Sequence, residues 1–303
     1  KMMKLIITGV SGFIGKNFLE NLPTDYEIIG LYYSNDEIIN FCKEKNINIK
    51  LYKCDLTDSN QVKELSIKIG KEFDKCLFLA SNTSMPLSRD NPRRDFELTV
   101  FTLVNFLTYF NVNRFIYMST AGVYDGLTGN VTVDNGLDPT FPYCISKLAA
   151  EYYVKFYKNI DKIKEYVILR FGGAFGKYSR GKFVSNLISD INSKKERIEI
   201  YGEGNNIINV MYVNDVVRAL RLVLESSIKN LVCDIGAENF TINEIITETA
   251  KAFNDEIKII HKPKFEKQKY MNFKFTSDFD TIFNFKRKYT YQEGVIDYSN
   301  EFK

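Results

Sequence analysis

The residues best suited to chemistry are a tyrosine and a lysine four positions apart, Tyr143 and Lys147. They fall near the start of a predicted helix over residues 142–157, and side chains at i and i+4 share one face of a helix. A lysine ammonium beside a phenol favours the phenolate. It therefore lowers the pKa of the tyrosine from its ordinary value of about 10 toward neutrality. The tyrosine can then act as an acid or a base, so the pair predicts proton transfer.

A hydroxyl group is expected next to this phenol. Other tyrosine and lysine pairs in the chain repeat the four-residue spacing, so the spacing alone is not specific. Tyr143 differs because it follows a predicted strand over residues 114–119, which runs directly into Thr120. The end of that strand can bring the threonine hydroxyl beside the phenol. Tyr143, Lys147 and Thr120 are therefore the candidate catalytic residues.

A glycine-rich turn lies between an apolar strand pattern over residues 4–8 and a helical pattern over residues 13–22. Its glycines are three residues apart, so the backbone can approach a pyrophosphate closely. The amides and dipole at the start of the helix then meet the negative charge. In this position the pattern predicts a dinucleotide-binding turn. The turn residues are Gly9, Gly12, Phe13, Ile14 and Gly15.

The end of the second predicted strand is where a dinucleotide-binding fold usually carries a ribose-binding acid. This chain has Tyr32 there, followed by Tyr33, Ser34 and Asn35. An acid would repel a 2′-phosphate, so its absence favours NADP, with Ser34, Asn35 and Lys16 as candidate phosphate donors. The alternative is that Tyr32 stacks near the adenine and that NAD still binds.

Strand and helix patterns alternate along the first 171 residues. Such alternation, with helices of ten or more residues, indicates βαβ units and a parallel sheet covered on both faces. The predicted fold class is therefore α/β, a doubly wound parallel sheet of the Rossmann type. The expected strands are residues 4–8, 26–33, 47–52, 76–80, 114–119 and 166–171, and the expected helices are residues 13–22, 36–45, 59–69, 93–110 and 142–157.

The alternation loosens after residue 171, where a glycine-rich loop precedes helical patterns over residues 183–193, 213–225 and 242–253. We therefore expect a dinucleotide-binding domain over residues 1–170 and a smaller, mainly substrate-binding lobe over residues 171–303. Segments near 205–235 are expected to return to the first domain.

Composition excludes several classes of protein. The 303 residues include 41 Lys plus Arg and 38 Asp plus Glu, a net charge of +3 that gives no basic stripe for nucleic acid. No apolar stretch approaches the roughly 20 residues that span a bilayer. The first eight residues run into a strand pattern instead of a signal peptide. We expect a cytoplasmic protein without a nucleic-acid or membrane partner.

Cysteine and histidine usage argues against metal and disulfide chemistry. The five cysteines form no C-x-x-C pair, which disfavours a disulfide framework and a structural zinc. The single histidine, His261, removes any multi-histidine metal site, and we expect it to be a surface residue near a strand end. No metal site is predicted.

Three motifs in chain order resemble those of the extended short-chain dehydrogenase/reductase family, and the resemblance covers nearly the whole chain. They are Gly-x-x-Gly-x-x-Gly at 9–15, Ser-Thr-x-x-Val-Tyr at 119–124 and Pro-Tyr-x-x-Ser-Lys at 142–147. Tyr-Gly-Glu-Gly at 201–204 and Tyr-Val-Asn-Asp-Val at 212–216 resemble the substrate-lobe signature of nucleotide-sugar epimerases, dehydratases and reductases.

The resemblance implies roles for matching residues. Tyr143 would be the acid/base, Lys147 would bind the nicotinamide ribose and the phenolate, and Thr120 would hydrogen-bond the reacting oxygen. The cofactor site it implies also includes Asp55 and Leu56 near the adenine, Leu79, Ala80 and Ser81 at a strand end beneath the cofactor, Thr99, Ser119, and Phe171 at the nicotinamide. The substrate site it implies comprises Ser81, Thr120, Gly173 and Ile208.

Three of these positions depart from the family pattern. Thr99 stands where the family usually has Asn, Gly173 replaces the usual substrate-contacting Asn, and Ile208 occupies the position where many members place an Arg on the diphosphate. Two expected nucleotide-sugar contacts are thus missing, which leaves the substrate class less defined than the fold.

The resemblance leaves several activities open. Family dehydratases carry an acidic pair after the catalytic Thr, whereas Ala121 and Gly122 follow Thr120 here, so dehydration is disfavoured. The missing ribose acid and the compact C-terminal lobe favour NADP-dependent reduction of a 4-keto sugar nucleotide. An NAD-dependent 4-epimerase of nucleotide sugars is the alternative. A dinucleotide sensor without turnover is disfavoured, because a sensor does not need Tyr143 and Lys147.

The predicted helix over residues 93–110 has few polar residues on any face. This indicates that other elements pack against more than one of its faces. Residues 148–157 supply a second apolar helix face. Two such helices per subunit would make a four-helix interface, and the family resemblance points to the same homodimer. The alternative is that the C-terminal lobe folds over this face.

Overall fold

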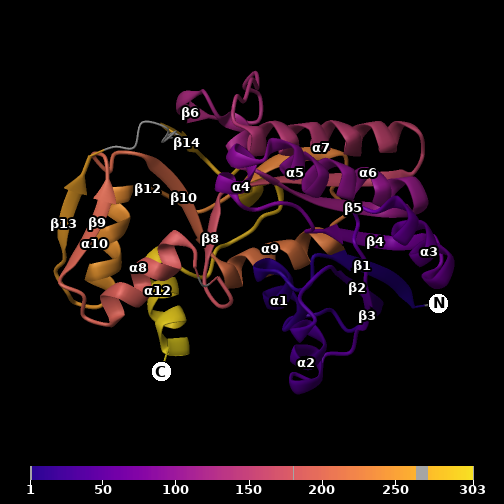
Figure 1. Ribbon diagram of the computed structural model, residues 1–303, viewed down its shortest axis with the longest axis horizontal. Coiled ribbons are helices and arrows are strands. Elements are labelled where there is room, and N and C mark those ends of the chain that lie inside the picture. The colour runs from indigo at the N-terminus through magenta and orange to yellow at the C-terminus, as the bar shows by residue number, and fades with distance from the viewer. Residues whose placement is uncertain (1, 180, 264–271, 303) are drawn as a thin grey trace. The chain divides into compact units, whose positions relative to one another are not determined.

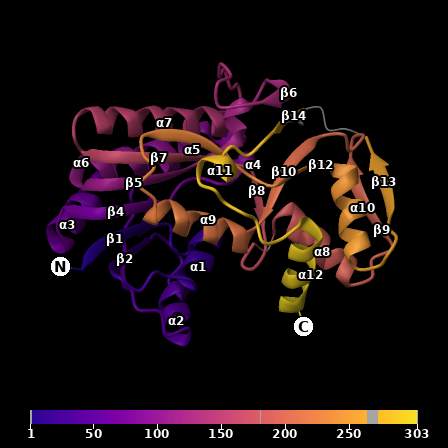
Figure 2. The same ribbon diagram turned by 180° about the vertical axis from the view of Figure 1, so that it is seen from behind.

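The computed structural model describes residues 2–179, 181–263 and 272–302. The chain forms two compact units. Unit 1 comprises Lys1–Asp125, Leu137–Phe171 and Leu220–Cys233, and unit 2 comprises Gly126–Gly136, Gly172–Ala219 and Asp234–Lys303. Figures 1 and 2 show the chain from opposite sides.

Unit 1 is built on a seven-stranded sheet of order β11-β7-β5-β4-β1-β2-β3. The pairs from β7 through to β3 are parallel, and the order reverses at β1, so the fold is doubly wound as predicted. Leu5, Ile6 and Ile7 are fully buried, as expected for a strand covered on both faces. The strands are β1 Met3–Thr8, β2 Tyr26–Tyr32, β3 Lys50–Lys53, β4 Glu72–Phe78, β5 Asn111–Thr120, β7 Ile163–Phe171 and β11 Leu231–Ile235.

Helices cover both faces of this sheet. Figures 1 and 2 show α6 and α7 along one face and α1 on the other. Phe78 of β4 and Phe106 of α6 meet edge to face at 5.4 Å between ring centroids, in a packed aromatic core. The helices are α1 Phe13–Leu19, α2 Glu37–Glu44, α3 Ser59–Ile69, α4 Met85–Asp90, α5 Pro92–Phe96, α6 Thr102–Tyr109 and α7 Pro142–Asn159, with a 3-10 turn at Ala121–Tyr124.

The predicted helix over residues 93–110 is wrong in detail. It is divided into α5, a π-helical turn at Glu97–Phe101, and α6. Asn91 begins α5 by accepting from the amide of Arg94, and Pro92 occupies the first turn, where a missing N–H costs little. The regular helical period used to predict this helix does not reveal the π-helical turn, because such a turn adds one residue to a single turn of the helix.

Residues 220–233 are held in unit 1 by Arg114, a buried arginine of β5. Its guanidinium donates to the carbonyl oxygen of Val223 at 2.8 and 3.0 Å and to that of Ile228 at 2.8 Å. Arg114 also pairs with Glu165 of β7 at 2.5 Å. A charged side chain is thus satisfied in the core by backbone acceptors and one carboxylate.

Unit 2 contains short strands that the sequence patterns did not predict. A three-stranded sheet has the order β12-β10-β8, and two pairs join β13 to β9 and β14 to β6. The strands are β6 Thr128–Val131, β8 Gly173–Phe175, β9 Arg197–Tyr201, β10 Ile207–Tyr212, β12 Glu238–Thr241, β13 Lys258–Lys262 and β14 Asn272–Phe275. The main helices are α8 Phe183–Asn192, α10 Ile242–Ala252 and α12 Tyr291–Ser299, with a short α11 at Phe279–Ile282.

The core of unit 2 is also aromatic. Tyr291 packs 5.1 Å from Phe175 and 5.1 Å from Phe240, measured between ring centroids. Thr241 and Thr290 each begin a helix with a capping box, which satisfies amides at the helix start. The helix α9, Val213–Glu225, begins in unit 2 and ends in unit 1.

Within the part of the chain that the structure describes, no helix is long and apolar enough to cross a membrane. The same residues contain no cluster of three or more His, Cys, Asp or Glu side chains that could hold a metal ion. His261 is exposed within β13, and its Nδ1 lies 2.9 Å from the carbonyl oxygen of Gly202.

Candidate active site

The three candidate catalytic residues come from two neighbouring elements of unit 1. Thr120 ends β5, and Tyr143 and Lys147 lie in the first two turns of α7, which Pro142 begins. The side chains of Tyr143 and Thr120 are hydrogen-bonded to each other. The Nζ of Lys147 donates to Ser81 Oγ at 2.8 Å and to the carbonyl oxygen of Met118 at 2.9 Å. The structure thus brings Tyr143, Thr120, Lys147 and Ser81 together.

The electrostatics of this cluster differ from the sequence expectation. Burial raises the pKa of Tyr143 to about 12, and the hydrogen bond with Thr120 opposes that rise only in part. Burial also lowers the pKa of Lys147 to about 8. The expected fall in the tyrosine pKa is wrong for this state of the protein. The physical reason is that burial outweighs every stabilising contact, and the lysine ammonium is directed to Ser81 and Met118.

A buried ionic network that the sequence analysis missed lies beside the catalytic cluster. Glu151 of α7 pairs with Arg170 of β7 at 2.9 Å, and their side chains are 1% and 5% exposed. Ser119 Oγ donates to Glu151 at 2.5 Å, and Arg170 donates to the hydroxyl of Tyr124 at 3.1 Å. Glu151 stands four residues after Lys147, so the helical i+4 spacing is the signal that could have identified it.

The glycine-rich turn has the close backbone contacts that a dinucleotide needs. Gly9 has φ +70°, and a Cβ there would lie 3.0 Å from the amide nitrogen of Ala80. A Cβ on Gly15 would lie 2.4 Å from the carbonyl oxygen of Gly9. Gly12 precedes α1 with no capping side chain, and the first turn of α1, which includes Phe13 and Ile14, has no acidic residue. These features fit a bound pyrophosphate.

The segment after β4 is fixed against this turn. Thr8 Oγ accepts from the amides of Leu79 and Ala80 at 3.0 Å each, which holds both residues next to Gly9. Ser81 follows and contacts Lys147. Leu79, Ala80 and Ser81, three of the predicted cofactor residues, therefore lie between the glycine-rich turn and Lys147, a candidate catalytic residue.

The loop after β3 carries Asp55 and Leu56. Asp55 accepts from the amide of Thr57 at 2.9 Å, which folds the loop into a turn. Asn105 of α6 donates to the carbonyl oxygens of Leu56 and Thr57 at 2.9 and 3.0 Å. Asn105 thus fixes the backbone of this loop against α6, and the side chain of Leu56 is buried.

An acid that the sequence analysis did not consider, Asp36, lies four residues beyond the end of β2, immediately before α2. Tyr32 is 7% exposed and its phenol is hydrogen-bonded to Asp36, four residues later. Lys53 of β3 donates to the Asp36 carboxylate at 2.9 Å. Ser34 is exposed, and Asn35 accepts from the amide of Glu37 at 3.1 Å. The buried ring of Tyr32 offers little surface for stacking.

The remaining predicted cofactor residues are buried. Thr99 lies in the π-helical turn, and its Oγ1 has no hydrogen-bond partner among the described residues. Phe171 ends β7 at 7% exposure, next to Arg170. Ser119 precedes Thr120 on β5 and is directed to Glu151.

Two of the four predicted substrate residues, Gly173 and Ile208, belong to unit 2. Gly173 begins β8 and is exposed. A Cβ on it would lie 2.8 Å from the carbonyl oxygen of Asn209, so the observed backbone does not accommodate a larger residue at 173. Ile208 is half-buried on β10 and opposite Phe240 of β12. Each unit therefore contributes its own subset of the predicted residues.

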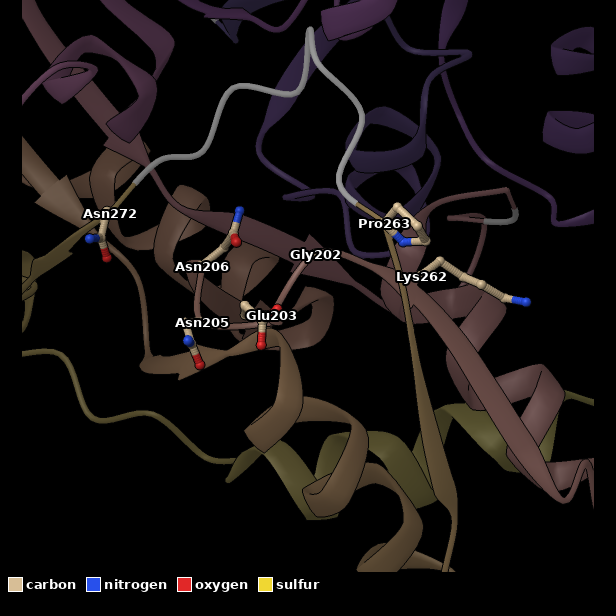
Figure 3. Close-up of a pocket in the computed structure, with 7 residues that line it drawn as sticks. All are labelled: Gly202, Glu203, Asn205, Asn206, Lys262, Pro263 and Asn272. Carbon is tan, nitrogen blue, oxygen red and sulfur yellow. The ribbon is translucent and has the colours of Figure 1, made fainter.

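Unit 2 also contains a cavity of about 400 Å³, and two of its lining residues, Gly202 and Glu203, belong to the Tyr-Gly-Glu-Gly motif at 201–204. Figure 3 shows asparagines on one side of it, with the Lys262 side chain directed away from them. The ammonium of Lys262 lies 3.6 Å from Glu199 of β9. The lining residues are Gly202, Glu203, Asn205, Asn206, Lys262, Pro263 and Asn272.

Comparison with known proteins defines the class of the chain. The model of the NAD dependent epimerase/dehydratase family matches residues 5–236. The chain belongs to this family, and it is an enzyme of the extended short-chain dehydrogenase/reductase type, as the motifs indicated.

Individual relatives span several activities. The chain is 28% identical to a "Putative UDP-glucose 4-epimerase" of Methanocaldococcus jannaschii, over 80% of this chain and 79% of that protein. It is 30% identical to a mouse dTDP-D-glucose 4,6-dehydratase, over 80% of this chain and 70% of the relative. A UDP-glucose 4-epimerase of Thermotoga maritima, solved with UDP-glucose, has the same fold, with a TM-score of 0.86, 20% identity and 99% coverage of both chains.

Proposed function

We propose that the chain is an NAD-dependent 4-epimerase of a nucleotide-activated sugar. The observation that carries this proposal is the hydrogen-bonded pair of Tyr143 and Thr120, with the ammonium of Lys147 one helical turn from the phenol. Such a cluster can remove a proton from a sugar hydroxyl and return it to the same oxygen. Unit 1 is proposed to bind the dinucleotide and unit 2 to bind the nucleotide sugar, through the region of Gly173 and Ile208.

The cofactor preference rests on Asp36. Its carboxylate returns an acid to the carboxyl end of β2, four residues later than the position that Tyr32 occupies. An acid at this edge can accept from a ribose hydroxyl and repels a 2′-phosphate. The sequence pattern favoured NADP because residues 30–35 contain no acid. The position of Asp36 supports NAD instead, which also accords with the family as a whole.

Each residue of the cluster would have a defined task in epimerisation. A bound NAD supplies the acceptor, and later the donor, of the hydride at the sugar C4. Tyr143, as the phenolate, would take the proton of the 4-hydroxyl, and as the phenol it would return a proton to the same oxygen. Thr120 accepts or donates a hydrogen bond at the same oxygen. Lys147 supplies the positive charge that lowers the cost of the phenolate.

The residues after Thr120 disfavour dehydration. Ala121 and Gly122 begin a buried 3-10 turn and carry no carboxyl or hydroxyl group. Elimination of water from a sugar needs an acid for the leaving hydroxyl and a base for the adjacent carbon. Neither residue can serve, which supports a reaction confined to one carbon.

A second candidate is reduction of a 4-keto sugar nucleotide by NADPH, the function that the sequence favoured. It is supported by Lys53 of β3, an exposed cation that pairs with Asp36 near the end of β2. If the Asp36 side chain left this pair, the Lys53 ammonium could bind a 2′-phosphate. A sensor without turnover is disfavoured, because the catalytic residues Tyr143, Lys147 and Thr120 are all present and in contact with one another or with the cofactor loop.

The decisive test is incubation of the purified chain with UDP-glucose, UDP-N-acetylglucosamine or dTDP-glucose in the presence of NAD, followed by proton NMR. We expect the 4-epimer of one substrate to form without net change in NADH. Tyr143→Phe is the control, because it keeps the ring and deletes the proton. Oxidation of NADPH by a 4-keto sugar nucleotide, with no epimer formed, would replace the proposal by the second candidate.

A homodimer is also proposed, through the apolar surface of α7 and the π-helical turn. Tyr152 and Phe156 of α7 are 62% and 50% exposed, and Phe101 of the π-helical turn is 47% exposed. These rings lie on the helices that the sequence predicted for a four-helix interface. Burial of such a surface around a two-fold axis would stabilise the dimer.

A further inference from the structure

The strongest feature that the catalytic scheme does not use is a fully buried carboxylate, Asp95 of α5. Ser146 Oγ donates to its Oδ2 at 2.6 Å, and Asn82 Nδ2 donates to its Oδ1 at 2.6 Å. Both hydrogen-bond partners that the structure gives Asp95 are neutral. A buried carboxylate without a directly paired cation is costly, so it needs a reason beyond packing.

The two partners of Asp95 are the chain neighbours of residues in the catalytic cluster. Ser146 precedes Lys147 on α7, and Asn82 follows Ser81, whose hydroxyl accepts from the ammonium of Lys147. Asp95 therefore connects helix α7, which carries Lys147, to the loop after β4, which carries the acceptor Ser81.

Asn82 extends this connection into the loop after β4. Its Oδ1 accepts from the amide of Ser84 at 2.8 Å, and its Nδ2 donates to the carbonyl oxygen of the same residue at 3.0 Å. The conformation of the loop that carries Ser81 is thus set by a side chain that Asp95 holds in place.

The charged and titratable groups around Lys147 come from four elements, α5, α7, β5 and β7. Glu151 lies on the same helix, but it is neutralised by Arg170 of β7. Tyr117 of β5 places its ring 5.2 Å from the Lys147 ammonium, and Tyr143 stays protonated because burial raises its pKa to about 12. Asp95, unlike Glu151, has no direct ion pair that neutralises its charge. Its negative charge therefore favours the protonated form of Lys147.

We propose that Asp95 is a positioning residue, which fixes Lys147 against Ser81 and holds the ammonium charge in the buried site. This inference rests on the proposed function only in assigning Lys147 to the cofactor and the phenolate. It does not depend on which sugar, or which reaction at C4, the enzyme uses.

The test is the pH dependence of NAD binding, measured by isothermal titration calorimetry between pH 6.5 and 10. In the wild type, affinity should fall as pH rises through the pKa of Lys147, which is about 8. Asp95→Asn keeps the shape of the side chain and removes the charge, and it should move this fall to lower pH by about one unit. Asp134→Asn, at an exposed position, is the matched control and should keep the wild-type midpoint.

A second variant separates the tether from the charge. Ser146→Ala removes one hydrogen bond and leaves the carboxylate, so it should weaken NAD binding roughly threefold to tenfold with an unchanged midpoint. An unchanged midpoint in Asp95→Asn would overturn the role of its charge. Wild-type NAD affinity in Ser146→Ala would overturn the positioning role of Asp95. If Asp95→Asn does not fold, the NAD affinity of Ser146→Ala alone decides whether the proposal stands. Loss of epimerisation alone, with these NAD profiles as expected, would reject only the proposed function.

Discussion

Replacing Glu151 by Gln tests how the buried ionic network supports the active site. The Arg170 guanidinium contacts the Glu151 carboxylate through Nε at 3.1 and 3.3 Å and through Nη2 at 2.9 Å. Its remaining side-chain partner is the Tyr124 hydroxyl at 3.1 Å. Glu151→Gln would leave the arginine charge in the core with one neutral acceptor in place of a carboxylate. Ser119 would also lose a charged acceptor.

The magnitude follows from the burial of both partners. Breaking a fully buried ion pair by removing one charge costs about 3–5 kcal/mol in the free energy of unfolding. For a folding unit of this size, such a loss lowers the midpoint of thermal unfolding by roughly 10 °C. The measurement is urea unfolding followed by far-UV circular dichroism, with differential scanning calorimetry as the second assay.

Two controls make the result specific. Glu27→Gln breaks a largely exposed pair with Lys50, and it should lower the stability far less than Glu151→Gln because solvent screens that pair. The double replacement Glu151→Leu with Arg170→Met removes both charges and should recover much of the lost stability. A cost below about 1 kcal/mol for Glu151→Gln would refute the reasoning, because the arginine would then have found solvent or another acceptor.

Four further outcomes are expected. Tyr143→Phe should lower turnover by roughly 10²-fold or more without changing NAD affinity, and retention of more than a tenth of the wild-type rate in the NMR assay would contradict its role. Lys147 has a pKa of about 8 in the folded protein against an ordinary value of 10.5, so the unfolded chain binds more protons between these pH values and stability rises with pH there. Lys147→Met should remove that rise in thermal scans from pH 7.5 to 10.5, and an unchanged slope would speak against the buried charge. Asp36→Asn should raise the ratio of NADP to NAD affinity in calorimetric titrations, and a constant ratio would exclude Asp36 from ribose selection. In light scattering, the wild type should have twice the 35.1 kDa chain mass, and Phe156→Glu should have the mass of one chain. Ile67→Glu, at another exposed apolar position, should keep the dimer mass. A wild-type monomer would reject the interface.

The fold of unit 1 could be predicted because its elements are long and strongly patterned. The helix expected over residues 59–69 is observed with the same bounds, since Asp58 caps it through the amides of Asn60 and Gln61. The helix expected from Pro142 begins there, because proline suits the first turn. The strand expected from Cys76 begins earlier, at Glu72, because Glu72, Asp74 and Lys75 interrupt the apolar run although the strand already extends through the buried Phe73.

Unit 2 could not be predicted in the same way. Its strands are three to six residues long, and β6, with the sequence Thr-Gly-Asn-Val, has almost no apolar period. Its partner β14 is more than 140 residues away in the sequence, at Asn272–Phe275. Pairing over such a distance depends on tertiary contacts that local propensity does not encode.

The active site shows the same division between motif and environment. The sequence pattern proposed Tyr143 and Lys147 from their spacing and the preceding strand, and Thr120 from the end of that strand. It did not identify Asp95 or Glu151, because each acts through residues that only the folded chain brings together. The direction of the Tyr143 pKa was also beyond the sequence, since desolvation depends on the atoms that surround the phenol.

The buried charges of unit 1 explain why motif and environment must be considered together. Lys147 and Arg170 are positive, Asp95 and Glu151 are negative, and all four side chains are almost completely buried. Glu151 and Arg170 contact each other directly, whereas Asp95 and Lys147 are connected through Ser146 and the loop of Ser81. The first arrangement mainly offsets the cost of burial. The second leaves the lysine ammonium without a direct carboxylate contact, which under the proposed function would let it bind a ribose hydroxyl and stabilise a phenolate while Asp95 supports its charge from a distance.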